Sequence, residues 1–125
     1  GLESIDHSVV ISDPGIKDCP MVYVSEEFTN QTGYNVAEIL GKNCRFLQGP
    51  ETDMNDVEHI RQAIKMRKSI TIDILNYKKN GEKFWNRLRI KPLFGPDGKI
   101  IFFAGEQNPI KIEDVRRYTF NKIIE

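Results

Sequence analysis

Two tight turns in the second half of the chain constrain the fold more than any other sequence feature. An Asn-Gly pair at 80–81 supplies the positive φ angles that a two-residue hairpin needs, and Gly-Pro-Asp-Gly at 95–98 marks a second turn. Alternating apolar residues predict strands around them at 69–78, 84–93 and 99–108. Because hairpins join antiparallel strands, these three runs predict an antiparallel meander.

The first half of the chain predicts two further strands and a series of helices. The expected elements are strands at 9–11 and 21–24, then helices from Ser25 to Gly33, at 36–40 and from Met54 to about residue 68. Pro109 is expected to end the sheet, and residues 111–125 to form a helix with a Glu113–Arg117 pair at i,i+4 spacing. The predicted class is α+β, a five-stranded antiparallel sheet with helices over one face and a flanking terminal helix.

Length and composition indicate one domain. The chain has 125 residues, with 18 Lys and Arg against 18 Asp and Glu. This zero net charge gives no reason to expect nucleic-acid binding, and no apolar run approaches the roughly 20 residues of a membrane span. Two cysteines make no disulfide framework, so a reducing, cytoplasmic location is expected. The start at Gly1 rather than Met suggests either a segment of a longer protein or a residue left by cloning.

The run between Gly41 and Gly49 mixes a thiol, a guanidinium and two amides with two large apolar side chains. If it is helical, Cys44 and Gln48 share one face, as do Asn43 and Leu47. Such a face suits a flat, partly polar organic ligand. A free cysteine is more often an inert small hydrophobe, but the shared face with Gln48 favours a position beside this ligand.

Each of the three long strands places one side-chain amide on its apolar face: Asn76, Asn86 and Gln107. An amide can be satisfied by nearby backbone, but leaving it buried and unpaired costs about 1–3 kcal/mol. Three on adjacent strands indicate a shared partner with alternating C=O and N–H groups, such as the pyrimidine edge of a flavin or a nucleobase. The expected apolar wall consists of Ile72, Ile74, Leu88, Ile90 and Phe103.

Two arginines are candidates for an anion. Arg61 sits at the edge of a helix face formed by Val57, Ile60 and Ile64, from which it either reaches solvent or joins Arg45 at a phosphate. A mononucleotide-like ligand would satisfy the arginines, the amides and the apolar slot together. No glycine-rich phosphate loop is present, and no convergent His, Cys or carboxylate set predicts a metal site or hydrolytic catalysis.

The sequence Gly-Lys-Asn-Cys-Arg-Phe-Leu-Gln-Gly at 41–49 resembles the motif of light–oxygen–voltage (LOV) photoreceptor domains, a branch of the PAS fold. Further matches follow in order at 50–53, 76–81, 84–86 and 105–107. The resemblance covers residues 8–108, leaving 1–7 as an N-terminal flanking segment and 109–125 as a C-terminal linker helix. It implies a blue-light sensor rather than an enzyme, with any effector outside this chain.

The resemblance also implies bound FMN and a photochemical role for Cys44, which adds reversibly to the flavin C4a carbon while N5 gains a proton. Gln107 would lie near N5 and O4 and reorient. Arg45 and Arg61 would hold the phosphate, Asn43 and Gln48 the ribityl chain and ring, and Asn76 and Asn86 the pyrimidine edge. The remaining residues expected at the flavin are Val10, Ser12, Cys19, Phe28, Leu47, Ile64, Leu88, Ile90 and Phe103.

Two positions depart from the family pattern: Cys19 replaces a common Asn near the ring, and Ser12 replaces a common Thr. Three alternatives stay open: a flavin redox sensor that does not use the cysteine, a PAS-type ligand-binding or dimerisation module without flavin, and a flavin enzyme. The outer sheet face carries Leu75, Tyr77, Trp85, Phe102 and Ala104 among basic residues, so we expect it to dock residues 111–125 or a second copy.

Overall fold

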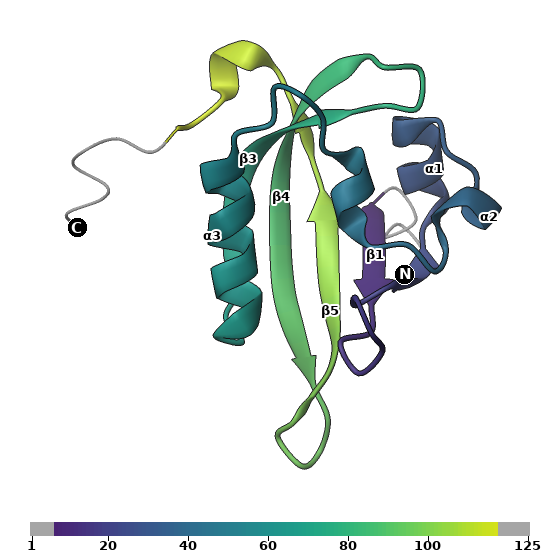
Figure 1. The fold of residues 1–125 in the computed structure, drawn as a ribbon, viewed down its shortest axis with the longest axis vertical. Helices are drawn as coiled ribbons and strands as arrows, with labels where there is room; N and C mark the ends of the chain where they lie inside the picture. The colour runs from purple at the N-terminus through teal and green to yellow at the C-terminus, as the bar shows by residue number, and fades with distance from the viewer. Residues whose placement is uncertain (1–6, 118–125) are drawn as a thin grey trace.

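The computed structural model describes residues 7–117, and Figure 1 shows their arrangement. The chain forms, in order, β1 (Ser8–Ser12), β2 (Met21–Val24), α1 (Glu26–Thr32), α2 (Val36–Ile39), the 3₁₀ helix η2 (Cys44–Leu47), α3 (Met54–Lys65), β3 (Ile70–Tyr77), β4 (Lys83–Phe94), β5 (Ile100–Gln107), β6 (Pro109–Ile110) and the 3₁₀ helix η3 (Ile112–Asp114). Among these elements, no helix is long and apolar enough to cross a membrane.

The sheet order is β2-β1-β5-β4-β3, and every pairing is antiparallel. The predicted meander is confirmed: Gly81 and Gly98 have φ angles of 89° and 79° in the two turns that join β3, β4 and β5. The N-terminal hairpin then pairs along the free edge of β5, with Val10 opposite Gly105. This pairing puts the last long strand at the centre of the sheet, where it contacts both halves of the chain.

Helices cover one face of the sheet, with α3 on one side of Figure 1 and α1 and α2 on the other. As predicted, α1 begins after Ser25 and ends at Gly33, whose φ of 81° suits a left-handed C-cap. The Ser25 hydroxyl does not cap the helix, because it accepts a hydrogen bond from the Val9 amide at 2.8 Å. Under these short helices lies an apolar core of Val10, Met21, Val24, Phe28, Ile39 and Leu47.

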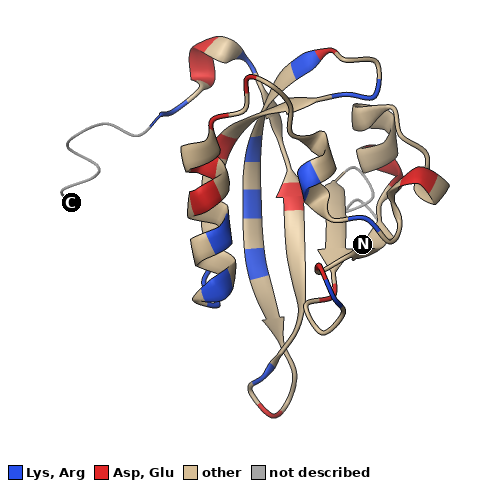
Figure 2. Cartoon of the chain, in the orientation of Figure 1, with Lys and Arg blue, Asp and Glu red and all other residues tan. Residues whose placement is uncertain are grey.

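The charge of α3 follows its backbone dipole (Figure 2). Acidic residues gather in the N-terminal half of the helix and basic residues in the C-terminal half, which stabilises both ends. Asp53 caps the helix by accepting a hydrogen bond from the Asn55 amide at 2.8 Å. On the sheet, β4 carries a row of basic residues.

The expectation that Pro109 ends the sheet is wrong. The register that pairs Arg89 with Glu106 continues beyond β5, so that Asn86 lies opposite Pro109 and Trp85 opposite Ile110. Proline is tolerated at the edge of a ladder, where its missing N–H group is not required. The sheet therefore gains the short strand β6 beyond the five that were predicted.

The helix predicted at 111–125 is not present in its described part, residues 111–117. This part contains only the three-residue η3, after which Val115 is extended with φ −67° and ψ 131°. The expected Glu113–Arg117 pair is replaced by ion pairs from Arg117 to Asp53 and Asp56. Tertiary contacts thus outweigh a weak local helix preference. Residues 118–125 of the predicted helix, and residues 1–6 of the predicted flanking segment, lie outside the described residues.

Candidate ligand-binding cavity

A cavity of about 230 Å³ lies between α3, η2 and the inner face of the sheet. This volume is below the usual range for organic ligands, roughly 300–1,000 Å³, so it suits a flat ring system whose tail lies at the mouth. It is lined by Val10, Ser12, Cys19, Asn43, Cys44, Arg45, Leu47, Gln48, Val57, Ile60, Arg61, Ile64, Ile74, Asn76, Leu88, Ile90, Phe103, Gly105 and Gln107.

Three amides from adjacent strands meet at the cavity floor, in one hydrogen-bonded cluster. The Asn86 Nδ2 group donates to Asn76 Oδ1 at 3.0 Å and to Gln107 Oε1 at 2.6 Å. Asn86 is wholly buried and does not line the cavity, whereas Asn76 and Gln107 do. Asn86 therefore supports the other two amides from behind the cavity lining, and its expected contact with the ligand stays a prediction.

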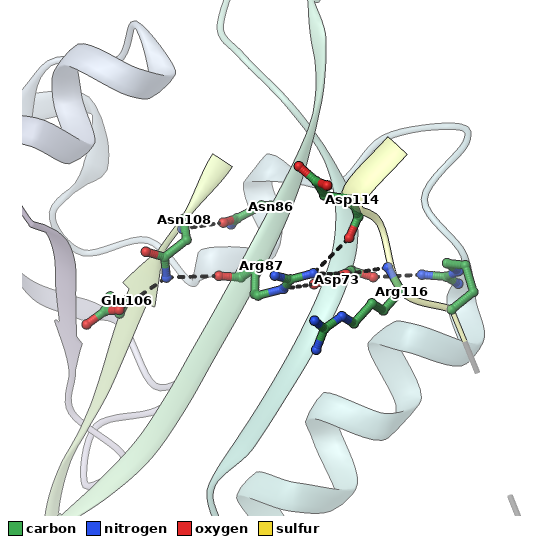
Figure 3. A network of polar contacts seen from close by, with 8 residues as sticks. Asp73, Asn86, Arg87, Glu106, Asn108, Asp114 and Arg116 are labelled. Carbon is green, nitrogen blue, oxygen red and sulfur yellow. Dashed lines mark hydrogen bonds and ion pairs between the residues drawn. The ribbon is translucent and has the colours of Figure 1, made fainter. Parts of the chain in front are cut away.

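Asn108 fixes which way the Asn86 amide points, because both its backbone and its side chain form hydrogen bonds with β4 (Figure 3). Its backbone N–H donates to Asn86 Oδ1 at 2.9 Å, while its side-chain Nδ2 donates to the Arg87 carbonyl at 3.2 Å. A backbone N–H can only donate, so the oxygen of Asn86 must face Asn108. The Asn86 amino group must then face the cluster, and this turns the oxygens of Asn76 and Gln107 away from the cavity.

The amino groups of Asn76 and Gln107 have few hydrogen-bond partners. Gln107 Nε2 is buried and makes no hydrogen bond with any described residue, and Asn76 Nδ2 reaches only the Leu75 carbonyl at 3.3 Å. Buried donors are normally paired, so the cavity floor calls for a ligand edge that carries acceptors. Gly105 leaves space beside them, since an added Cβ there would lie 3.3 Å from Val10 Cγ2 and 3.6 Å from Gln107 Nε2.

Cys44 begins η2, which Asn43 caps by accepting a hydrogen bond from the Arg45 amide at 3.0 Å. The Cys44 Sγ atom lies 3.6 Å from the sulfur of Met21 and faces the cavity. Burial, with a smaller effect from Cys19, raises the pKa of Cys44 to about 12. The side chain is therefore a protonated thiol at neutral pH, and not a thiolate nucleophile of the kind that cysteine proteases use.

Cys19 reaches the same cavity from the loop between β1 and β2. Two successive residues of this loop, Asp18 and Cys19, have positive φ angles of 69° and 47°. Burial, and then the nearby Asp13 and Asp18, raises the pKa of Cys19 above its ordinary value. The cavity thus has two protonated thiols, which are free cysteines in the structure.

Both arginines lie at the cavity mouth, where each is paired with a carboxylate. Arg45 Nη1 donates to Asp18 Oδ1 at 2.8 Å, and Arg61 Nη2 lies 3.1 Å from Glu58 Oε2. The arginine side chains are 59% and 74% exposed. Exposed ion pairs contribute little to stability, so an incoming phosphate could exchange for these carboxylates.

The structure places all but two of the expected ligand-binding residues on the cavity wall. The two exceptions are Asn86 and Phe28, which is fully buried in the apolar core under α1. Of the predicted apolar wall, Ile72 is buried but is not a lining residue. The sequence identified Val57 and Ile60 only as part of an apolar helix face, and Gly105 only as part of the motif match at 105–107. Which of the lining residues touch a ligand remains a prediction.

The comparisons with known proteins agree with this geometry. A family model described as a PAS domain matches residues 6–108. A solved structure described as "Flavin Analogue Sheds Light on Light-Oxygen-Voltage Domain Mechanism" is 43% identical with a TM-score of 0.87, and covers 90% of this chain and 83% of that chain. The LOV domain of an Erythrobacter litoralis blue-light activated histidine kinase is 39% identical with a TM-score of 0.80, and covers 83% and 95%.

The chain belongs to the LOV branch of the PAS family. This LOV domain is also 47% identical over 106 residues to phototropin-2 of Oryza sativa subsp. japonica. That match covers 85% of the chain but only 12% of the phototropin. The predicted LOV membership and PAS fold are confirmed, and one of the similar domains comes from a kinase described as blue-light activated.

Proposed function

We propose that this LOV domain senses blue light with an FMN molecule whose ring occupies the cavity. The observation that carries this proposal is the pair of amides on the cavity-lining residues Asn76 and Gln107: both oxygens are taken by Asn86, and the Gln107 amino group has no partner among the described residues. The pyrimidine edge of a flavin carries the carbonyl and imine acceptors that such donors require. The apolar lining from β3, β4, β5 and α3 would exclude water from the two faces of the ring.

The arginines at the mouth fit the phosphate of FMN. Each guanidinium offers several N–H groups in a fixed fork, which suits phosphate oxygens better than a single carboxylate. Arg45 and Arg61 approach the mouth from η2 and α3, so one phosphate would tie these two elements together. Asn43 and Gln48 lie beside them on the lining, where an amide can meet the hydroxyl groups of a ribityl chain.

Cys44 is the proposed reactive residue. Bound FMN would supply the light absorption and an electrophilic carbon, C4a, to which the Cys44 sulfur would bond reversibly as its thiol proton moved to N5. The protein keeps Cys44 protonated beforehand by burying it, so the thiol brings its own proton to the reaction. In darkness Cys44 would regain its proton and return to the free thiol.

Gln107 would carry the signal away from the cavity. Its amino group faces an acceptor before illumination, and a newly protonated N5 would instead favour the Gln107 oxygen. Turning the amide would break the 2.6 Å bond from Asn86 to Gln107 Oε1 and so disturb the amide cluster. We propose that β5, the segment after it and the outer sheet face pass this change to an effector or to a second copy of the chain.

An absorption spectrum before and after blue light tests the proposal. The purified chain should be yellow, lose its blue absorption band on illumination and recover in darkness. Cys44→Ala should stay yellow and show no such reversible loss. A colourless protein would leave only a ligand-binding or dimerisation module. A yellow protein in which Cys44→Ala changes nothing would instead support a redox sensor.

A further inference from the structure

The described part of the C-terminal segment, residues 111–117, lies against the outer side of β3 and the start of α3 (Figure 3). We refer to residues 111–117 as the strap. Two hydrogen bonds hold its backbone: the Arg116 amide donates to Asp73 Oδ2 at 2.6 Å, and Arg87 Nη2 donates to the Asp114 carbonyl at 2.9 Å. Asp73 is itself held by Arg87, which donates from Nε and Nη2 at 2.8 and 3.0 Å.

Arg117 links this strap to two other elements at once. Its Nη1 group donates to the Asp73 carbonyl of β3 at 2.7 Å. Its Nη2 atom lies 2.8 Å from Asp56 Oδ2 and 3.1 Å from Asp53 Oδ2, at the start of α3. The guanidinium also stacks over the Trp85 ring of β4, 5.4 Å from its centroid. One side chain thus joins the sheet to the N-terminal end of α3.

Asp56 makes this link more than a surface contact. Its side chain is only 1% exposed, and no hydrogen bond from a described residue reaches either carboxylate oxygen. The 2.8 Å contact with Arg117 is an ion pair between a guanidinium at the surface and a buried carboxylate. Removing one partner of a buried ion pair is far more disruptive than breaking an exposed pair.

The helix held in this way is also a wall of the cavity. Ile60 and Ile64 follow Asp56 by one and two turns, and both line the cavity together with Val57 and Arg61. A tether on Asp56 therefore restrains the face of α3 that would cover a bound ring. We propose that the strap clamps α3 against the sheet through Arg117, and that this clamp sets how fast the cavity releases its ligand.

The clamp also implies a way to regulate the domain. Measuring it by ligand release rests on the proposed function, the binding of FMN. If docking of the strap slows ligand release by stabilising the bound state, then bound ligand must stabilise docking by the same factor, because coupling between two sites is reciprocal. A protein segment or domain attached beyond the strap could then alter ligand retention by pulling Arg117 away from α3.

The test compares Arg117→Met with Arg116→Met in the 125-residue chain. Met has a similar length and no charge, and the exposed Arg116 contributes a backbone amide that the substitution retains. We expect Arg117→Met to release FMN roughly five- to tenfold faster than the native chain, within the usual range of allosteric coupling. Arg116→Met should stay within about twofold. Equal release rates from the two variants would overturn the clamp.

Amide hydrogen exchange tests the clamp independently of the proposed function, because it can be measured without FMN. In the absence of FMN, Arg117→Met should speed amide exchange in α3 and the strap but not in β5, and FMN should slow α3 and strap exchange in the native chain. Native protein that takes up no FMN would refute the proposed function, and the clamp would then be judged on exchange alone. Unchanged α3 exchange, or an equal increase in β5, would overturn it.

A second variant covers the possibility that Arg117→Met does not fold. Asp56→Asn combined with Arg117→Met removes both charges, so no unpaired carboxylate stays buried. This double variant should fold, release FMN faster than the native chain and show the same rise in α3 exchange. Native release and exchange in the folded double variant would overturn the proposal.

Discussion

Asn86 is the residue on which the polarity of the cavity floor depends. It lies behind the cavity, accepts one hydrogen bond from the backbone of Asn108 and donates two to the neighbouring amides. Replacing it with a carbon side chain would leave those three groups without their partner. At the scale of single residues, Asn86 thus matters because of the direction it gives Asn76 and Gln107.

Asn86→Leu should therefore lower the free energy of unfolding by at least about 2 kcal/mol, because an unsatisfied buried polar group costs roughly 1–3 kcal/mol. Urea unfolding of the ligand-free chain measures this effect. Asn30→Ala is the control, since Asn30 is exposed in α1, and its effect should stay within about 0.5 kcal/mol. Similar values for the two variants would show that the amide cluster contributes little to stability.

Cys44 gives a second prediction at this scale, from a pKa that burial raises to about 12. Alkylation requires the thiolate, so the labelling rate of Cys44 by iodoacetamide should rise about tenfold per pH unit from pH 7 to pH 10. A small peptide thiol, with an ordinary pKa near 8.5, should level off within that range. Mass spectrometry of the ligand-free chain, with Cys44→Ser to identify the site, measures both rates. A plateau for Cys44 below pH 10 would contradict the predicted burial.

At the scale of elements, the connection between η2 and α3 packs against β3 through Gly49 and Tyr77. An added Cβ at Gly49 would lie 2.8 Å from Tyr77 Cζ, too close for the ring to stay in place. The Tyr77 hydroxyl also accepts a hydrogen bond from the Glu51 amide at 2.9 Å. This packing fixes how η2, and with it Cys44, stands relative to the sheet.

Gly49→Ala should cost about 1–3 kcal/mol of stability, the usual effect of overpacking, because the Tyr77 ring must move and its hydrogen bond must lengthen. A double-mutant cycle checks the cause: in a Tyr77→Ala background, the additional cost of Gly49→Ala should nearly vanish. The measurement is urea unfolding of all four proteins. An additive cost would mean that the backbone at Gly49, and not the ring contact, is responsible.

At the scale of the whole molecule, Asp73 connects the sheet, the strap and the response to acid. Burial raises the pKa of its carboxyl, but the Arg87 side chain and the Arg116 amide outweigh this effect and hold the pKa below its ordinary value of 3.8. A group whose pKa is lowered by folding stabilises the folded state above its ordinary pKa. That stabilisation is lost as the pH falls through the lowered value.

Asp73→Asn should therefore reduce stability at pH 7, and the difference from the native chain should narrow as the pH falls below about 4. The free energy of unfolding of both proteins between pH 7 and pH 3 gives this difference. Burial raises the pKa of Asp56, an effect of opposite sign, but Asp56 is present in both proteins and largely cancels. A difference that stays constant with pH would show that the Asp73 charge does not stabilise the fold.

Local patterns in the sequence determined the long strands, the capped helices and the side of the sheet that carries the amides. These features depend on residues two to four positions apart, so turn chemistry and periodicity are enough to predict them. The residues that line the cavity were largely identifiable for this reason. For η2 the outcome differs from the expectation: the segment is a short 3₁₀ helix in which Asn43 and Gln48 are extended caps. The expected α-helical i,i+4 faces with Cys44 and Leu47 therefore do not form, although all four residues line the cavity.

Only the tertiary structure decided which partner each polar group takes. Pro109 continues the sheet because Asn108 stays bonded to β4 on both sides: its carbonyl accepts from the Arg87 amide at 2.8 Å, and its N–H donates to the side chain of Asn86, 22 positions away. Arg117 forms ion pairs with Asp53 and Asp56, which the fold brings close and partly buries, and not with the expected local partner Glu113. The energetic effect of an ion pair or an amide contact depends more on its burial than on the spacing of the two residues along the chain. Burial arises only when the sheet and the helices pack together, so the sequence alone does not reveal it.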